Sequence, residues 1–239
     1  MVPAGAGRDR TQATTRQRKT RRMNDLFGVD SPLTRVLTKI ADLMIANLLF
    51  IVTSLPVITI GAAVTALNYT TMKILRDEQT SIVKDYWRSF RENFKQATVL
   101  WGIVVLLGAV MAAWYLVVDK LIQPGALRVG LWVVFYLILF RLVMAVVWLF
   151  ALQSKFVNTV RETLRNARLL PIRHLFTTVM VLIVTTLPVV VTVFYPKAVG
   201  YGLAWLLIGF SGVCFLNSIF LNAVFRKYVP DEALVPGQG

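Results

Sequence analysis

The chain has almost none of the residues from which catalytic and metal centres are usually built. It contains one cysteine, Cys214, and one histidine, His174, in 239 residues. A lone cysteine cannot form an internal disulfide, and a zinc site draws on several Cys, His or carboxylate ligands. A glycine-rich phosphate loop, a nucleophile elbow and an HExxH helix are also absent. We therefore predict no catalytic residues, no metal site, no cofactor and no enzymatic activity.

Charged residues are scarce too, at 16% of the chain, whereas hydrophobic residues reach 56%. This balance is typical of a membrane protein. A helix of about 20 residues spans the roughly 30 Å hydrocarbon layer of a bilayer. Six apolar stretches are long enough to cross it: Val36–Leu55, Val57–Leu75, Val99–Val118, Val129–Leu152, Leu175–Tyr195 and Tyr201–Phe225. We predict an all-α, polytopic transmembrane bundle.

Acidic residues are the rarer charge, with 12 Asp and Glu against 26 Lys and Arg, a net charge of +14. Twenty-two of the basic residues lie in alternate connections and termini, against three in the other connections. Such a bias marks the basic segments as cytoplasmic and removes the need for a nucleic-acid partner. We expect both termini to be cytoplasmic.

The apolar run from Ile40 to Leu67 has basic flanks on both sides. Two crossings joined at Ser54-Leu55-Pro56 keep both flanks inside, and proline favours a break there. This interpretation gives six crossings. The alternatives are five crossings, with one long helix kinked at Pro56 and the N-terminus outside, or a re-entrant pair that enters the membrane without crossing it.

The chain has no visible signal peptide or separate soluble domain. Residues 1–23 are predicted to be a disordered basic tail that contacts anionic lipids, residues 24–228 the transmembrane domain, and residues 229–239 a short C-terminal tail.

Two basic connections are amphipathic at helical spacing. The segment "SIVKDYWRSFRENFKQA", residues 81–97, and the segment "KFVNTVRETLRNARLL", residues 155–170, each place apolar residues on one face and Lys or Arg around the rest. We expect both helices to lie along the cytoplasmic interface as anchors. Alternatively, they form a docking surface for a partner. The candidate docking residues are Trp87, Arg91, Phe94, Arg161 and Arg165.

A shift of 74 residues places the first of these segments, and the two apolar stretches after it, on the second segment and the last two stretches. This pattern predicts a parallel repeat of interfacial helix, crossing, short loop and crossing.

Polar residues inside apolar stretches are costly and are often functional. Arg141 is expected to face the bundle interior, where amides and carbonyls hold it as a structural clamp or where it contacts an anion. Asp42, Asn47 and Asn217 are further candidates, and Pro56 is a candidate wall of a cavity because it frees a backbone carbonyl.

The run "DSPLTRVLTKIADLMIANLLFIVTSLPVITIGAAVTALNYTTMKILRDE", followed by "FRENFKQAT", resembles the YesL family of bacterial integral membrane proteins, whose biochemical function is undefined. The resemblance is strongest from Met23 to Trp101, and "LRNARLLPIRHL" extends it. It implies a bacterial cytoplasmic-membrane protein, often encoded near carbohydrate uptake and degradation systems, and it supplies no catalytic residues.

The leading functional hypothesis is an accessory or component of a carbohydrate transport system, with sugar-importer subunits or other membrane proteins as partners. The alternative is a structural or regulatory membrane scaffold without its own substrate. A membrane-embedded enzyme would need clustered acid and base groups, which the sequence does not show.

Overall fold

The computed structural model describes residues 32–78, 80–156, 158–194 and 198–228. The tails predicted at residues 1–23 and 229–239 lie outside the described residues. The chain divides into two compact units, Met1–Asp42 and Leu43–Gly239, with the boundary inside the first described helix.

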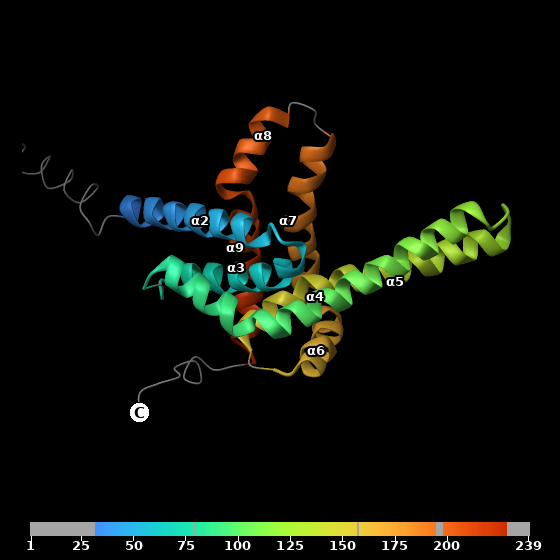
Figure 1. The fold of residues 1–239 in the computed structure, drawn as a ribbon, viewed down its shortest axis with the longest axis horizontal. Coiled ribbons are helices and arrows are strands. Elements are labelled where there is room, and N and C mark those ends of the chain that lie inside the picture. The colour runs from blue at the N-terminus through green and yellow to red at the C-terminus, as the bar shows by residue number, and fades with distance from the viewer. Residues whose placement is uncertain (1–31, 79, 157, 195–197, 229–239) are drawn as a thin grey trace, which may run out of the picture. The chain divides into compact units, whose positions relative to one another are not determined.

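Helix dominates, and the described ranges contain no strand. The elements are α2 (Pro32–Ser54), the 3-10 turn η1 (Val57–Thr59), α3 (Ile60–Leu75), α4 (Ile82–Lys120), α5 (Ala126–Lys155), α6 (Val160–Arg173), α7 (Leu175–Phe194), α8 (Ala198–Ala204), the π-helix η2 (Trp205–Gly209) and α9 (Phe210–Phe225) (Figure 1). Five helices in the described ranges are long and apolar enough to cross a membrane: Leu33–Ser54, Ile82–Lys120, Ala126–Lys155, Leu175–Phe194 and Tyr201–Phe225. The predicted all-α bundle is confirmed, and the protein is a multi-pass membrane protein.

The first apolar run is broken where the sequence predicts a break. α2 ends at Ser54 and α3 begins at Ile60. The carbonyl of Pro56 itself accepts hydrogen bonds from the Thr59 amide and hydroxyl, at 2.9 and 2.7 Å. The single long helix of the five-crossing alternative is therefore wrong, whereas its count of five equals the number of long apolar helices in the described ranges.

The second predicted crossing does not reach crossing length. α3 has 16 residues, about 24 Å of helix against roughly 30 Å of hydrocarbon, and it is not among the five long apolar helices. Eleven of its residues are buried, and it packs against α4, α5 and α9. The structure therefore shows a buried central helix at this place, instead of a sixth full-length span.

The first amphipathic segment is not a separate helix. It forms the beginning of α4, which has 39 residues, or about 58 Å of helix. The sequence from Ile82 to Trp101 contains neither Gly nor Pro to interrupt the hydrogen-bond ladder. The predicted interfacial helix, residues 81–97, and the crossing after it therefore form one continuous helix.

The second amphipathic segment forms the separate helix α6. A capping box between Thr159 and Glu162 starts it. Pro171 lies in its last turn, and the chain leaves helical geometry at His174. The Thr178 hydroxyl then donates to the carbonyls of Pro171 and His174, at 3.1 and 2.9 Å, so the break between α6 and α7 leaves these carbonyls satisfied.

Figure 1 shows α4 and α5 lying side by side as a long hairpin, and α7 running beside α9. Close packing of α3 against α4 depends on Gly61, because a Cβ there would lie 2.7 Å from the Trp101 Cβ and would also strike the Ala97 carbonyl. The absence of a side chain at Gly61 thus permits the close contact of the two helices. The main apolar core surrounds Trp148, Leu152 and Phe225.

Candidate functional site

An ion pair joins the end of α3 to the start of α4. Lys73 Nζ donates to Asp85 Oδ1 at 2.8 Å, and the two side chains are 18% and 8% exposed. Arg88 lies 3.6 Å from the same carboxylate oxygen and donates to the Tyr69 hydroxyl at 2.6 Å. One buried carboxylate is thus held between two cations beside an aromatic ring.

Lys73 and Asp85 are not among the site residues predicted from the sequence. The sequence signal that could have identified Asp85 is its place on the helix. Asp85 shares the buried side of α4 with Ile82, Tyr86 and Ser89. A carboxylate on a buried face requires a cation or hydrogen-bond donors nearby. Its second oxygen, Oδ2, is buried and has no hydrogen-bond partner among the described residues.

Asn47 holds the π-helix in place. Its amide nitrogen donates to the carbonyls of Trp205 and Leu206, at 3.0 and 2.7 Å, and its side-chain oxygen accepts from the Ser211 amide at 2.9 Å. A π-helix displaces the regular i to i−4 ladder, and the fully buried Asn47 bonds to backbone groups in and just after it. The predicted candidate Asn47 therefore has a local structural task.

Asn217 connects α9 to α7. Its amide nitrogen donates to the Thr185 hydroxyl at 2.9 Å, while its side-chain oxygen is buried without a hydrogen-bond partner among the described residues. On the α3 side of α9, the Thr71 hydroxyl lies 3.1 Å from Ser218 Oγ and 3.3 Å from Cys214 Sγ. Small polar side chains thus link the central helix to its neighbours, as is common between membrane helices.

Pro56 and Asp42 are the other two candidates from the first apolar run. Pro56 is exposed in the turn after α2, and its carbonyl is occupied by Thr59. Asp42 is half-buried on α2, at the end of the first compact unit. Neither residue lines the described groove.

Arg141 is exposed, so the expectation that it faces the bundle interior is wrong. Its guanidinium donates to the Arg168 carbonyl on α6, at a long 3.5 Å. This part of α5 has few neighbours to bury a charge, and a long arginine side chain reaches toward more polar surroundings instead. The partner is a carbonyl, as in the clamp hypothesis, but the contact is at the surface.

The predicted docking residues of α4 lie along its exposed side. Trp87 is 43% exposed, and the Arg91 guanidinium lies 5.7 Å from the centre of its ring. Phe94 is half-buried and contacts Phe90, with 5.6 Å between ring centres. Five exposed residues of this side form the α4 cationic face, defined as Lys84, Trp87, Arg88, Arg91 and Lys95, and the half-buried Phe94 lies outside this set.

The predicted docking residues of α6 are exposed as well. Arg161, Arg165 and Arg168 point away from the core and form the α6 cationic face. The opposite side of α6, including Leu164 and Ala167, packs into the main core. Glu162 belongs to the helix cap, and hydrogen bonds from the Thr159 amide and hydroxyl lower the pKa of its carboxyl.

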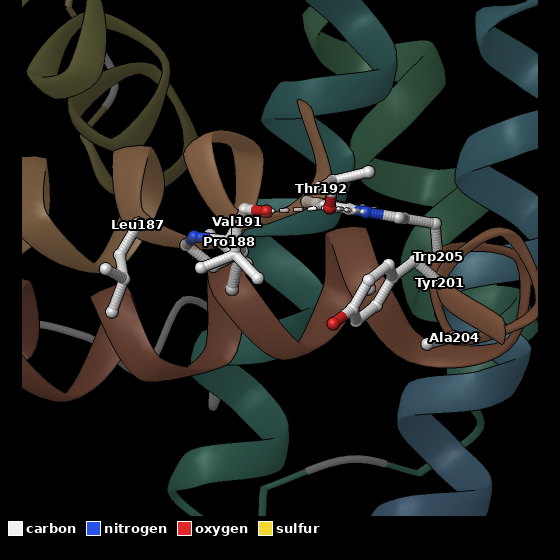
Figure 2. Close-up of a pocket in the computed structure, with 9 residues that line it drawn as sticks. Leu187, Pro188, Val191, Thr192, Tyr201, Ala204 and Trp205 are labelled. Carbon is white, nitrogen blue, oxygen red and sulfur yellow. Dashed lines mark hydrogen bonds between the residues drawn. The ribbon is translucent and has the colours of Figure 1, made fainter. Parts of the chain in front are cut away.

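An apolar groove lies between α7 and the α8–η2–α9 segment. It encloses about 280 Å³ and is lined by Leu187, Pro188, Val191, Thr192, Tyr201, Ala204, Trp205, Gly209 and Val213. Figure 2 shows the Thr192 hydroxyl meeting the Trp205 indole, which donates to it at 2.9 Å. The groove thus offers mainly rings and methyl groups, and the polar atoms of Thr192 and Trp205 are paired with each other.

No group of three His, Cys, Asp or Glu side chains that would hold a metal ion occurs among the described residues. The chemistry that the arrangement supports is recognition: two exposed cationic faces, and one apolar groove.

The comparisons with known proteins give one match. A family model described as "Protein of unknown function, DUF624" matches residues 43–115, from within α2 to most of the way along α4. The chain is similar to that family over this segment, which overlaps the run that resembles the YesL family. No curated protein and no solved structure matches the chain.

Proposed function

We propose that this protein is a non-catalytic accessory component of a membrane complex and that its α4 and α6 cationic faces hold a partner. The observation that carries the proposal is that the two sides of α6 differ. Its apolar side is packed into the core, while Arg161, Arg165 and Arg168 remain exposed. A helix fixed on one side presents its charges as a ready-formed surface for an acidic partner.

The carbohydrate transport system is the proposed setting. Its support is the resemblance of residues 23–101 to the YesL family, whose genes often lie near carbohydrate uptake and degradation systems. The proposed partners are sugar-importer subunits.

The sidedness follows from the same charges. We place both termini and both cationic faces in the cytoplasm of a bacterial cell, because basic connections are retained on that side of the membrane. This sidedness requires that α2 and α3 together return to the side on which α2 starts, as two crossings or as a re-entrant pair. The charged tip between α4 and α5, where Arg128 lies 3.2 Å from Asp119, then lies outside.

The second candidate is a scaffold without its own substrate. Thr71, Asn47 and Asn217 favour it, because each bridges two helices. This candidate needs no transport partner, so copurification separates the two.

The experiment is purification of the full-length protein from its native cells in mild detergent, with identification of copurifying subunits by mass spectrometry. A double variant, Arg161→Glu with Arg165→Glu, reverses two charges of the α6 cationic face. Lys120→Glu is the matched control, because Lys120 is exposed at the opposite tip.

We expect a sugar-importer ATPase or permease to copurify with the wild type and the control, and to be lost from the double variant. A protein that is reproducibly solitary favours the scaffold and rejects the transport setting. Retention of the partner by the double variant rejects the α6 cationic face as the docking surface.

A further inference from the structure

The groove between α7 and α8–η2–α9 continues a membrane-facing surface. Both walls belong to helices that are long and apolar enough to cross a membrane, Leu175–Phe194 and Tyr201–Phe225. α7 exposes Leu187 in the groove wall, and it exposes Val189 and Val193 next to the groove. Apolar side chains exposed on such helices face lipid, so the groove opens from a surface that acyl chains already cover.

Two local deformations lie on either side of the groove. Pro188 lies inside α7 and removes one ladder hydrogen bond there. On the other wall, the π-helix Trp205–Gly209 widens one turn. Gly209 is part of this wall. It packs closely on Trp205, since a Cβ at Gly209 would lie 2.5 Å from the Trp205 ring.

The groove selects against polar ligands. Thr192 Oγ1 donates to the Pro188 carbonyl at 2.7 Å and accepts from Trp205 Nε1 (Figure 2), so the Tyr201 hydroxyl is the remaining polar side-chain group of the wall. The wall carries no charged residue. At about 280 Å³, the groove lies just below the ~300–1,000 Å³ range of ligand pockets, which suits one chain and not a whole lipid.

We propose that this groove binds one hydrocarbon chain of a membrane lipid, and that Asn47 keeps the groove open by holding the π-helix through the carbonyls of Trp205 and Leu206 and the amide of Ser211. Asn47 is a positioning residue, because it does not line the groove. The proposal is independent of the docking function above.

The test is photo-crosslinking in liposomes of phosphatidylglycerol that carries a diazirine in one acyl chain, with labelled peptides mapped by mass spectrometry. Ala204→Phe fills the groove from an exposed position. Ala112→Phe is the matched control, because Ala112 is an exposed alanine on α4, away from the groove. We expect label concentrated in residues 187–192 and 201–213 of the wild type and the control, and its loss there in Ala204→Phe.

Unchanged label in Ala204→Phe, label spread evenly over α4, α5, α7 and α9, or crosslinks to another protein in place of lipid would each overturn the proposed site. Asn47→Leu tests the positioning role, with loss of groove label expected in the folded protein. Where Asn47→Leu does not fold, Gly209→Ala replaces it, because its Cβ displaces Trp205. A folded Asn47→Leu or Gly209→Ala protein with full groove label would contradict the role of the π-helix.

Discussion

The central helix α3 and the distal half of the α4–α5 hairpin, residues 101–140, have opposite construction. Eleven of the sixteen residues of α3 are buried, and they include Thr65, Asn68, Thr70 and Thr71. In the distal half of the hairpin only Val118 and Phe135 are buried, and most of the exposed surface is apolar. Polar groups therefore lie inside the protein, and hydrocarbon side chains lie outside.

The difference shows which interactions hold each region to the rest of the protein. Between helices in a membrane, lipid is as apolar as leucine, so close packing and hydrogen bonds drive association. α3 has both, through Gly61 and through hydroxyl pairs such as Thr71 with Ser218. The distal hairpin instead ends in an aromatic cluster, with Tyr115 and Trp132 centred 5.2 Å apart, next to the charged tip. Aromatic residues beside charges are typical of the membrane–water boundary.

The largest expected effect comes from removing one charge beside α3. Lys73→Met leaves the Asp85 carboxylate, 8% exposed, without its closest cation. We expect a loss of about 3 kcal/mol of unfolding free energy, since a buried charge without its partner is costly. An SDS titration in mixed micelles measures it.

The double variant Lys73→Met with Asp85→Leu is the control, and we expect it to recover most of the loss. If the single variant were as stable as the wild type, the ion pair would not contribute to holding α3 on α4.

Next comes the close approach of α3 and α4. Gly61→Ala should cost about 2 kcal/mol, because the new Cβ overpacks the contact with Trp101. Gly108→Ala in the distal hairpin is the matched change, with nothing within 4 Å of the added Cβ. There we expect a gain of up to about 1 kcal/mol from helix propensity. Equal effects of both changes on the unfolding midpoint would remove the contrast between the two regions.

Arg141→Leu should change stability by less than about 1 kcal/mol, because the guanidinium is exposed and its hydrogen bond to the Arg168 carbonyl is long, at 3.5 Å. Copurification of partners should also be unchanged. A variant that no longer folds would restore the clamp hypothesis, and a folded variant that loses its partner would make Arg141 functional.

A small pH effect is expected outside the spans. Partial burial, followed by the charges of Lys227 and Arg173, lowers the pKa of His174 below its ordinary 6.5. The folded protein then binds fewer protons than the unfolded chain near this pH, so stability falls as the pH drops below 6.5. His174→Asn should flatten this slope in unfolding measurements between pH 5 and 7, and an unchanged slope would assign it to another group.

Particular residues show what the sequence predicts and where it stops. The break at Pro56 follows from the proline itself, and the apolar stretches predict the five long helices. The two amphipathic segments look alike, but only the second has a proline, Pro171, near its end, and only the second is a separate helix. Whether such a segment continues into the crossing depends on local breakers more than on its pattern.

The wrong and missing site residues share one cause. Arg141 lies within an apolar stretch, so its burial was inferred from position along the chain, but the neighbouring helices do not cover that side of α5. Lys73 lies near the end of an apolar stretch and Asp85 lies inside the first amphipathic segment, and only the packing of α3 on α4 brings them to 2.8 Å. Sequence periodicity identifies a helical face, but it does not tell which helix covers it.

The central claim is that α3 buries polar groups inside the protein while the distal hairpin exposes apolar side chains to lipid. Spin-label accessibility in liposomes tests it most directly. Single cysteines in a Cys214→Ala background at Val105 and Leu137, in the distal hairpin, are compared with one at Ala62, in α3. We predict frequent collision with oxygen and little with a water-soluble nickel chelate at Val105 and Leu137, and little with either at Ala62. Strong collision with the nickel chelate at Val105 and Leu137 would place the distal hairpin in water and contradict the account.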